Sequence, residues 1–546
     1  MHELAALGCA GKHKGNMYRD FLRHVKVKCK MDVQPFEVDI PVRLPHSDTV
    51  VMEPHSILLP HEVFYWMARY PTEFDARVLG GSPQHSAAYW QSQRQQPWFE
   101  GHVAREAIDA GKCVAPLRIY GDDAEVRKGK SCLILTWSGS ACRHVSTRMS
   151  RFLIAALPVD KTVENMRAHD LIYGHIVWSF TALLDGKFPL TDPDGEPWPP
   201  GSWRARQAGA PLDGRRACVG ALAEFMGDWK WLRECLKLKR NYNCRLCCHL
   251  CLAQRDRAPF AYDFSLTAGW RGTMVSETSW RHEYGDLPDI ARLPGFSLSM
   301  TLPDPMHTIH LGLCLVIIGS VLRVLIERDY FGTFQGRWEI RCRAALQAAF
   351  VRFSNYARRH KIKNSQQRFT PGMMHMTTMS SEFPEMKGKA FNAAVVTQWL
   401  NAELRTDPRT TPIESACMEG ICGILGMMHS RTRTVRLTAS EARRFLEFGQ
   451  GHLITYARLS QQAQAANERL WPIKPKHHMF CHLVLRAHST RTLPGWCFCD
   501  EDYNGVVLKA FRGSPSMRWL GCRIALSARL RLWRSTAGGK GVETSA

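Results

Sequence analysis

Three apolar runs, a helical pattern and a fourth apolar run that ends on an acid constrain the fold of this chain more than any other feature. The first three runs are PLRIYGDD, SCLILTWS and SRFLIAALP, between Pro116 and Pro158. Each is apolar or β-branched and is bounded by turn or charged residues, which is typical of strands. Together they predict a β-meander.

The segments that follow continue this order. HDLIYGHIVWSFTALLDGKFP has apolar residues at helical spacing and predicts a helix from about His169 to about Gly186. RRACVGALAEFMGDWKWLRECLKL fits either a helix or a buried strand that ends at Gly227 and Asp228, and we expect the strand, followed by a helix. Three strands, a helix and a further strand that carries an acid is the order of the ribonuclease-H-like fold, so the sequence predicts an α/β chain with such a core.

Two aspartates stand where this fold would place metal ligands. Asp122 follows the apolar run LRIYG, with Asp123 as the competing choice, and Asp228 stands likewise in FMGDWKWL. Carboxylates that share two divalent metals can support cleavage and transfer of a phosphodiester, and Mg²⁺ or Mn²⁺ suits such a site. A simple turn is the alternative interpretation of each Gly-Asp pair.

The charge of the chain indicates a polyanionic partner. Lys and Arg number 72 and Asp and Glu number 50, which gives a formal net charge of +22. Nucleic acid is the commonest partner for such an excess, although many of these charges could simply solvate helix faces. Arginine recurs among apolar and aromatic residues, as suits a DNA channel, in WRARQ, FLRHVKVKCK, SRTRTVRLTASEARRFLEF and RIALSARLRLWRS.

Cysteines cluster in NYNCRLCCHLCLAQRD, which holds two Cys-x-x-Cys pairs, Cys244/Cys247 and Cys248/Cys251. Either pair can supply two thiolates to a tetrahedral Zn²⁺. The chain has 19 cysteines, and its first residues lack the apolar stretch of a secretory signal. We therefore expect a reducing compartment, in which these cysteines are thiols or metal ligands and not disulfides.

The other zinc ligands are expected from LPDPMHTIHLG, where Asp304, His307 and His310 stand three apart at the start of a helix. Residues at that spacing share one helix face. Capping of that helix is the alternative role for Asp304. A second group is interpreted as structural or as facing phosphate, with metal binding as the alternative, and it comprises His477, His478 and His482.

Five segments, taken in order, resemble the catalytic core of CACTA-type eukaryotic transposases: IYGDDAEV, LILTW, FLIAALP, GDWKWLRECLKL and CRLCCHLCLA. The resemblance covers roughly residues 110–510. It implies a DDE transposase, an enzyme that cleaves DNA at transposon ends and joins the freed 3′-hydroxyl to target DNA. It also implies Cys248 and Cys251 as the zinc thiolates, ahead of Cys244 and Cys247, with an Asp-x-x-His pair to complete the site.

The same resemblance implies a third acid after a long insertion, in the region of IKPKHHMFCHL and GWCFCDEDYNGVVLKAF. Asp500, Glu501 and Asp502 are the candidates. Glu501 is favoured because the family uses Glu, and Asp502 is the second choice. The alternative is an acidic helix start that the helix dipole favours.

We expect five regions along the chain. They are residues 1–110, for which no fold is predicted; 111–240, the first part of the core; 241–465, the Cys/His cluster and a mainly helical insertion; 466–535, the last core helix with the third acid; and 536–546, a disordered tail. Within the insertion, long helical patterns run through 310–350, 390–428 and 438–465. Leu311–Ile326 predicts a buried helix, so no membrane span is expected.

The predicted function is metal-dependent DNA cleavage and strand transfer by a nuclear, homo-oligomeric transposase. It would hold Mg²⁺ or Mn²⁺ at the carboxylates and Zn²⁺ at the Cys/His cluster. The alternative is an inactive protein of transposase origin that binds DNA or other proteins through a zinc-bearing insertion. No P-loop, dinucleotide-binding glycine motif, Gly-x-Ser-x-Gly elbow or His-Glu-x-x-His helix stands in a supporting context, so no small-molecule cofactor is expected.

Overall fold

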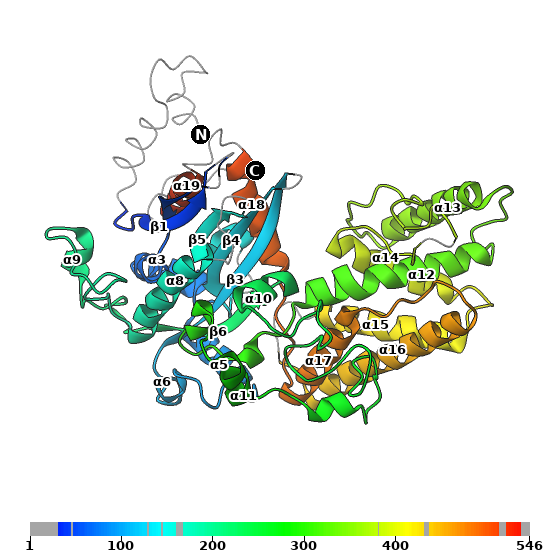
Figure 1. Cartoon of the computed structure of the whole chain (residues 1–546), viewed down its shortest axis with the longest axis horizontal. Coiled ribbons are helices and arrows are strands. Elements are labelled where there is room, and N and C mark those ends of the chain that lie inside the picture. The colour runs from blue at the N-terminus through cyan, green and yellow to red at the C-terminus, as the bar shows by residue number, and fades with distance from the viewer. Residues whose placement is uncertain are drawn as a thin grey trace, which may run out of the picture.

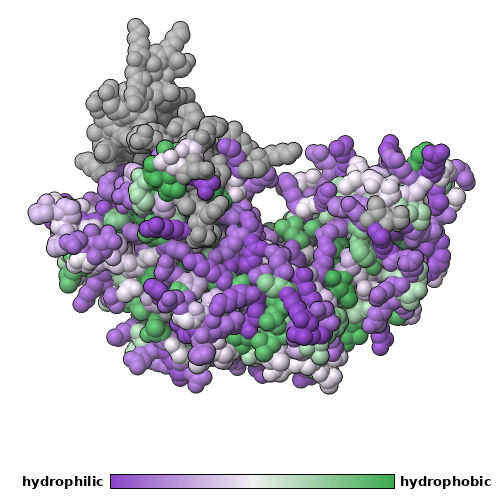
Figure 2. All heavy atoms as spheres, in the orientation of Figure 1, coloured by the Kyte–Doolittle hydropathy of each residue, from purple (hydrophilic) through white to green (hydrophobic). Residues whose placement is uncertain are grey.

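The chain forms two lobes, one around a mixed β-sheet and one built of helices (Figure 1). The computed structural model describes residues 31–44, 47, 49–127, 130–142, 146–159, 167–379, 382–430, 436–512 and 520–536. All but the first residue of the expected tail over 536–546 lies outside these ranges. Figure 2 shows a notch between the two lobes on this face, with a mainly hydrophilic surface around it.

The sheet has four strands in the order β5-β4-β3-β6. The predicted meander is confirmed, because β3 (Val114–Arg127), β4 (Lys130–Gly139) and β5 (Phe152–Pro158) pair antiparallel in sequence order. The fourth strand, β6 (Val219–Gly227), lies beside β3 and runs parallel to it. A parallel pair needs a crossover connection, and the predicted helix, α8 (Arg167–Asp185), lies on that connection and packs against β6.

Residues 31–109 lie within the region for which the sequence predicted no fold, and they pack on the sheet lobe. The structure has a β-hairpin and four short helices there: β1 (Phe36–Arg43), β2 (Val50–Ile57), α3 (Pro60–Ala68), α4 (Pro71–Arg77), α5 (Pro83–Gln93) and α6 (Arg105–Asp109). Their apolar side chains share one core with the sheet. In α5, for example, the buried Trp90 donates a hydrogen bond from Nε1 to the carbonyl of Val114 in β3, at 2.8 Å. Residues 31–109 are therefore part of the sheet lobe.

The helical lobe has a core of its own. Its main elements are the π-helix η7 (Met306–Leu313) and the α-helices α12 (Cys314–Glu327), α13 (Trp338–Arg359), α14 (Ala390–Leu404), α15 (Pro412–Ser430), α16 (Ala439–Ala465) and α17 (Pro475–Thr490). The pattern expected over 390–428 is thus two helices. Phe480 and Val484 of α17 are buried in this lobe, so it extends past the expected boundary at 465.

Met306–Glu327 is long and apolar enough to cross a membrane by length and composition alone. Of its most apolar window, 83% is buried inside the protein, which is typical of the core helix that the sequence predicted. Shorter helices complete the description: α7 (Thr147–Ser150), α9 (Trp203–Gln207), α10 (Trp229–Cys235) and α11 (Glu277–Tyr284). At the end of the chain, α18 (Phe498–Arg512) returns to β3, and α19 (Leu520–Thr536) packs on β5.

One buried histidine makes the helical lobe sensitive to acid. His452 donates a hydrogen bond from Nδ1 to the carbonyl of Cys417 at 2.9 Å, and Nε2 is buried without a partner among the described residues. Burial lowers the pKa of His452 to about 4, although the bond to Cys417 acts in the opposite direction. Because the unfolded chain takes up a proton near pH 6.5 and the folded one does not, stability is complete above pH 6.5 and falls as the pH drops toward 4.

His452→Gln is therefore expected to flatten the dependence of stability on pH. The wild-type chain should lose about 2 kcal/mol of unfolding free energy between pH 7 and pH 5 through this group alone. Urea unfolding at the two pH values measures the difference, and His488→Gln, at an exposed position of α17, is the control. An unchanged slope in His452→Gln would contradict the assignment.

Candidate carboxylate and metal sites

The two Gly-Asp dipeptides lie side by side in the sheet. In the parallel register of β3 and β6, Gly121 pairs with Gly227, so Asp122 and Asp228 follow on neighbouring strands. The indole of Trp231 covers both glycines, since a side-chain carbon would lie 2.1 Å from the ring at Gly121 and 2.2 Å at Gly227. Side chains alternate along a strand, so the aspartates face away from this indole. The Gly-Asp pattern thus has a packing cause, and Asp228 also caps α10 by accepting from the Trp231 amide at 2.6 Å.

Helix α18 brings the third acid to the same face of β3. Glu501 accepts a hydrogen bond from the Tyr120 hydroxyl of β3 at 3.0 Å. Its neighbours have other surroundings: Asp500 is buried and pairs with Arg151 at 2.9 Å, and Asp502 is exposed. Of the three candidates, Glu501 therefore lies with the aspartates, while the second choice, Asp502, faces solvent.

The three acids gather negative charge at one place, where Asp122 is buried and Asp228 and Glu501 are half-buried. Burial, followed by the charges of Glu501 and Asp228, raises the pKa of Asp122 to about 8. Within the described part of the chain, no Lys or Arg pairs with Asp122, Asp228 or Glu501. The competing candidate Asp123, by contrast, has a cation of its own, Lys230 at 3.0 Å. The arrangement fits a bound cation, which would compensate the negative charge of the three acids.

One imidazole supplies part of the missing positive charge. His307 donates from Nδ1 to Asp304 at 2.9 Å, and its Nε2 lies 3.5 Å from Glu501 Oε1. Burial alone would lower the pKa of His307, but the bond to Asp304 and the charges of Asp304 and Glu501 raise it to about 9. Asp304 also accepts from the Cys497 amide at 2.8 Å, just before α18 begins. A protonated His307 thus links η7 of the helical lobe to the third acid.

Neutral donors hold the carboxylates in place. Asn504 of α18 donates from Nδ2 to Asp122 Oδ2 at 2.9 Å and to the Tyr120 hydroxyl at 3.1 Å. Tyr120 in turn donates to Glu501. Fixed rotamers of this kind are what a metal site requires of its ligands.

A second site is a buried cluster of two cysteines and two histidines. Cys248 and Cys251 come from a loop, and His478 and His482 come from successive turns of α17. One ligand atom from each residue lies within 4.8 Å of all the others, and all four residues are buried. The Nε2 atoms of His478 and His482 lie 3.0 Å apart. Cys251 Sγ lies 3.3 Å from His478 Nε2, and Cys248 Sγ lies 3.4 Å from His482 Nε2. Two thiolates and two imidazoles at such separations could hold a metal such as Zn²⁺.

The surroundings of this Cys₂His₂ cluster orient its members toward the centre. His478 donates from Nδ1 to the carbonyl of Ala261 at 2.9 Å, which leaves Nε2 for the cluster. Hydrogen bonds from Cys248 and then from the two histidines hold the pKa of Cys251 well below the usual range of a thiol. A thiolate is the form that binds metal.

The predicted second half of the zinc site was wrong. Asp304 and His307 lie with Glu501, and His310 Nε2 lies 3.1 Å from His429 Nε2 in a stacked pair. The physical reason is the start of η7, where the Asp304 carboxylate caps the helix by accepting from the His307 amide at 2.8 Å. The capping alternative was therefore correct for Asp304.

The other cysteine pair also lies outside the cluster. The thiol of Cys244 bonds the carbonyl of Lys239 at 3.4 Å, and that of Cys247 contacts a backbone carbonyl at 3.9 Å. His478 and His482, interpreted from sequence as structural or phosphate-facing with metal binding as the alternative, are the residues that complete the cluster. Their spacing of four residues, which places both on one helix face, is the signal that could have found them.

Several predicted DNA-contacting arginines serve the fold. Arg204 of WRARQ bonds Glu62 at 2.6 Å, and the buried Arg529 of α19 donates to the carbonyls of Met31 and Val33, each at 2.5 Å. The stretch FLRHVKVKCK lies outside the described residues, as does RTRTV at 431–435. The internal bonds of Arg204 and Arg529 reduce the exposed charge that is available to a DNA backbone.

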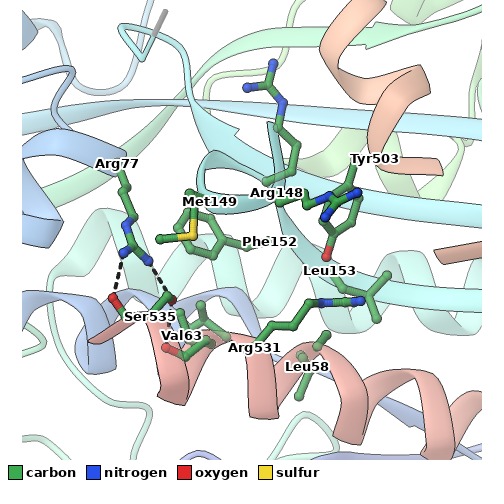
Figure 3. Close-up of a pocket in the computed structure, with 13 residues that line it drawn as sticks. Leu58, Val63, Arg77, Arg148, Met149, Phe152, Leu153, Tyr503, Arg531 and Ser535 are labelled. Atoms are coloured by element: carbon green, nitrogen blue, oxygen red, sulfur yellow. Dashed lines mark hydrogen bonds between the residues drawn. The ribbon is translucent and has the colours of Figure 1, made fainter. Parts of the chain in front are cut away.

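A small cavity near the end of α19 is lined by arginines, and one of them, Arg77, bonds another lining residue (Figure 3). Arg77 donates to the hydroxyl and the carbonyl of Ser535, at 2.7 and 2.6 Å. The cavity measures about 30 Å³, which is room for about two water molecules. We therefore assign it no ligand.

Comparison with known proteins gives no family. No protein-family model matches the chain, and a search of curated proteins finds no match. The function is therefore inferred from the chemistry of the carboxylate site and the Cys₂His₂ cluster.

Proposed function

We propose that this protein is a metal-dependent DNA strand transferase of the DDE transposase class. The observation that supports the proposal best is the meeting of Asp122, Asp228 and Glu501, from β3, the end of β6 and α18, without a lysine or arginine partner among the described residues. Structural acids are normally paired, as Asp123 and Asp500 are here. A group of three neighbouring acids that has only the imidazole of His307 beside it is more typical of a functional site.

The order of the strands also supports a ribonuclease-H-like core. The sequence predicted three strands, a helix and a fourth strand for that fold. The three strands pair antiparallel, and the fourth lies parallel beside the first. On this reading the helical lobe is an insertion between β6 and α18. After the insertion the chain packs on the sheet again through α18, the helix that carries Glu501.

The three carboxylates would hold Mg²⁺ or Mn²⁺. When bound, such ions stabilise the charge on phosphate and activate the attacking oxygen. Water attacks the phosphorus and the 3′ oxygen leaves as a hydroxyl; that hydroxyl then attacks a phosphodiester of the target and displaces its 3′ oxygen. Asn504 and Tyr120 keep the carboxylates oriented, and His307 limits the negative charge at Glu501.

The Cys₂His₂ cluster and the net charge complete the proposal. A Zn²⁺ ion at the cluster would join the loop at 248–251 to α17 and so stabilise the helical lobe. The net charge of +22 suits a DNA partner, with transposon ends and target as substrates. A homo-oligomer acting in the nucleus is the setting that this activity implies.

The test is nicking of supercoiled plasmid DNA by the purified full-length chain. With Mg²⁺ or Mn²⁺ we expect nicked and then joined products, and none with Ca²⁺ alone or after chelation. Products that carry a 3′-hydroxyl would match the proposed bond cleavage. Absence of any metal-dependent nicking, in a chain that is folded and binds DNA, would reject catalysis.

That result would favour the second candidate, a non-catalytic DNA- or protein-binding zinc protein of transposase origin. One observation favours it: Asp122 and Glu501 already accept hydrogen bonds from Asn504 and Tyr120. The Cys₂His₂ cluster does not depend on the acids, so binding would survive their replacement.

A further inference from the structure

A cavity of about 480 Å³ lies where the two lobes meet. Its lining comes from the ends of β3 and β4, from α14 and α15 of the helical lobe, and from the segment that leads into α18. Pockets that hold small molecules measure about 300–1,000 Å³, so this cavity is large enough for one planar ring with its substituents. Neither the carboxylate site nor the Cys₂His₂ cluster uses it.

Aromatic rings form one side of this interlobe cavity. Trp496 and Phe498 meet edge to face, with ring centroids 5.3 Å apart, and His429 lies 5.6 Å from Trp496. Phe391 of α14 also lines the cavity and is 46% exposed, so its ring is accessible to a ligand. Such walls favour a flat, apolar ring that can stack.

The polar side of the cavity carries no excess charge. Arg118 pairs with Glu224, and Arg151 pairs with Asp500 at 2.9 Å, so each guanidinium is compensated. The hydroxyl of Ser140 is buried, lines the cavity and has no hydrogen-bond partner among the described residues, although Tyr89 lies near it. A neutral ligand with hydrogen-bonding edges fits this lining better than a phosphate does.

The cavity is close to the carboxylates along two elements. Phe498 and Cys499 line it at the start of α18, and Glu501 lies in the same first turn. On β3, Arg118 and Asp122 share one face and are four residues apart, which is roughly 13 Å at 3.3 Å per residue. A nucleotide next to the phosphate at the carboxylates could reach the cavity.

We propose that the interlobe cavity receives one nucleobase, unstacked from the DNA strand beside the phosphate that is cut. A base is planar, uncharged and rich in hydrogen-bonding edges, as the lining requires, and stacking on aromatic side chains tolerates any base sequence. The proposal rests on the proposed function, because it assumes a DNA strand at the carboxylates. It adds a residue with a testable role, Phe391.

The experiment uses a forked DNA duplex with 5-iodouracil at the first unpaired nucleotide, mixed with the full-length protein in a buffer without chelator, Mg²⁺ or Mn²⁺. Near-ultraviolet light links this base to an aromatic ring stacked on it. We expect the link at Trp496, Phe498 or Phe391, as mapped by mass spectrometry. Phe391→Ala should reduce the yield and weaken binding of the fork about fivefold to a hundredfold, the range of one base–aromatic stack.

Phe383→Ala is the matched control, because Phe383 is also 46% exposed in the helical lobe but does not line the cavity. It should bind and crosslink as the wild type does. Crosslinks that map elsewhere, equal effects of the two substitutions, or no binding of the fork would each overturn the proposal. Since neither Mg²⁺ nor Mn²⁺ is added, crosslinking does not depend on cleavage. A chain that crosslinks in the cavity but never cuts DNA refutes only the catalysis, and one that cuts without such a crosslink refutes only the base pocket.

Discussion

DNA nicking is expected to fall about a thousandfold or more in each of Asp122→Asn, Asp228→Asn and Glu501→Gln. Each change removes one negative charge from the set that would hold the metal ions, whose stabilisation of transition-state charge amounts to several kcal/mol. The fold should persist, because burial, and after it the repulsion from Glu501 and Asp228, raises the pKa of Asp122 to about 8. A neutral amide of the same shape relieves that repulsion, so the melting temperature should stay the same or rise.

Matched controls separate this role from general effects of charge. Asp123→Asn changes the neighbouring residue on β3, which pairs with Lys230, and Asp502→Asn changes the exposed neighbour of Glu501. Both should nick DNA within a few-fold of the wild type. Initial rates of plasmid nicking in Mg²⁺ and in Mn²⁺, with melting temperatures of all five variants, give the comparison. Full activity in folded Asp228→Asn would remove the carboxylates from the mechanism.

The sequence predicted the part of the fold that local pattern controls. The three strands, α8 and the change from strand to helix at Asp228 follow from runs of apolar residues with clear ends. Local pattern does not show that β6 pairs with β3, because the two strands are about a hundred residues apart in sequence. The segments before residue 110 are short and have no long periodicity, so their packing on the sheet comes from tertiary contacts that no local window contains.

Long-range partners limited the prediction of the sites. The Cys-x-x-Cys spacing indicated Cys248 and Cys251. His478 and His482 lie more than two hundred residues further along the sequence, in a segment with the pattern of an ordinary amphipathic helix. Asp304 and His307 had the expected spacing, yet the cap of η7 turns them toward Glu501. The family resemblance favoured Glu501 among three consecutive acids. The contacts that distinguish Glu501 from Asp500 and Asp502 are long-range, and sequence alone does not supply them.

Loss of the Cys₂His₂ cluster is expected to unfold the helical lobe. Purified protein should carry about one Zn²⁺ per chain, and Cys251→Ser should lose it. Zn²⁺ binding to such ligands is worth about 10–16 kcal/mol in isolated zinc-finger peptides, and loss of even a few kcal/mol lowers the melting temperature of a lobe of this size by about 10 °C or more. Without metal, the two imidazole nitrogens 3.0 Å apart and two buried thiols have few other partners.

Cys244→Ser is the control, since the Cys244 thiol bonds the carbonyl of Lys239 outside the cluster. It should keep the zinc and the melting temperature of the wild type, and a Cys251→Ser chain that also keeps one zinc would refute the assignment. Because Asp304 and His307 of the helical lobe hold the start of α18 and the side chain of Glu501, unfolding that lobe should also stop DNA nicking. Nicking that survives zinc removal would therefore separate the two sites, and would show that Glu501 keeps its position through Tyr120 and the sheet lobe alone.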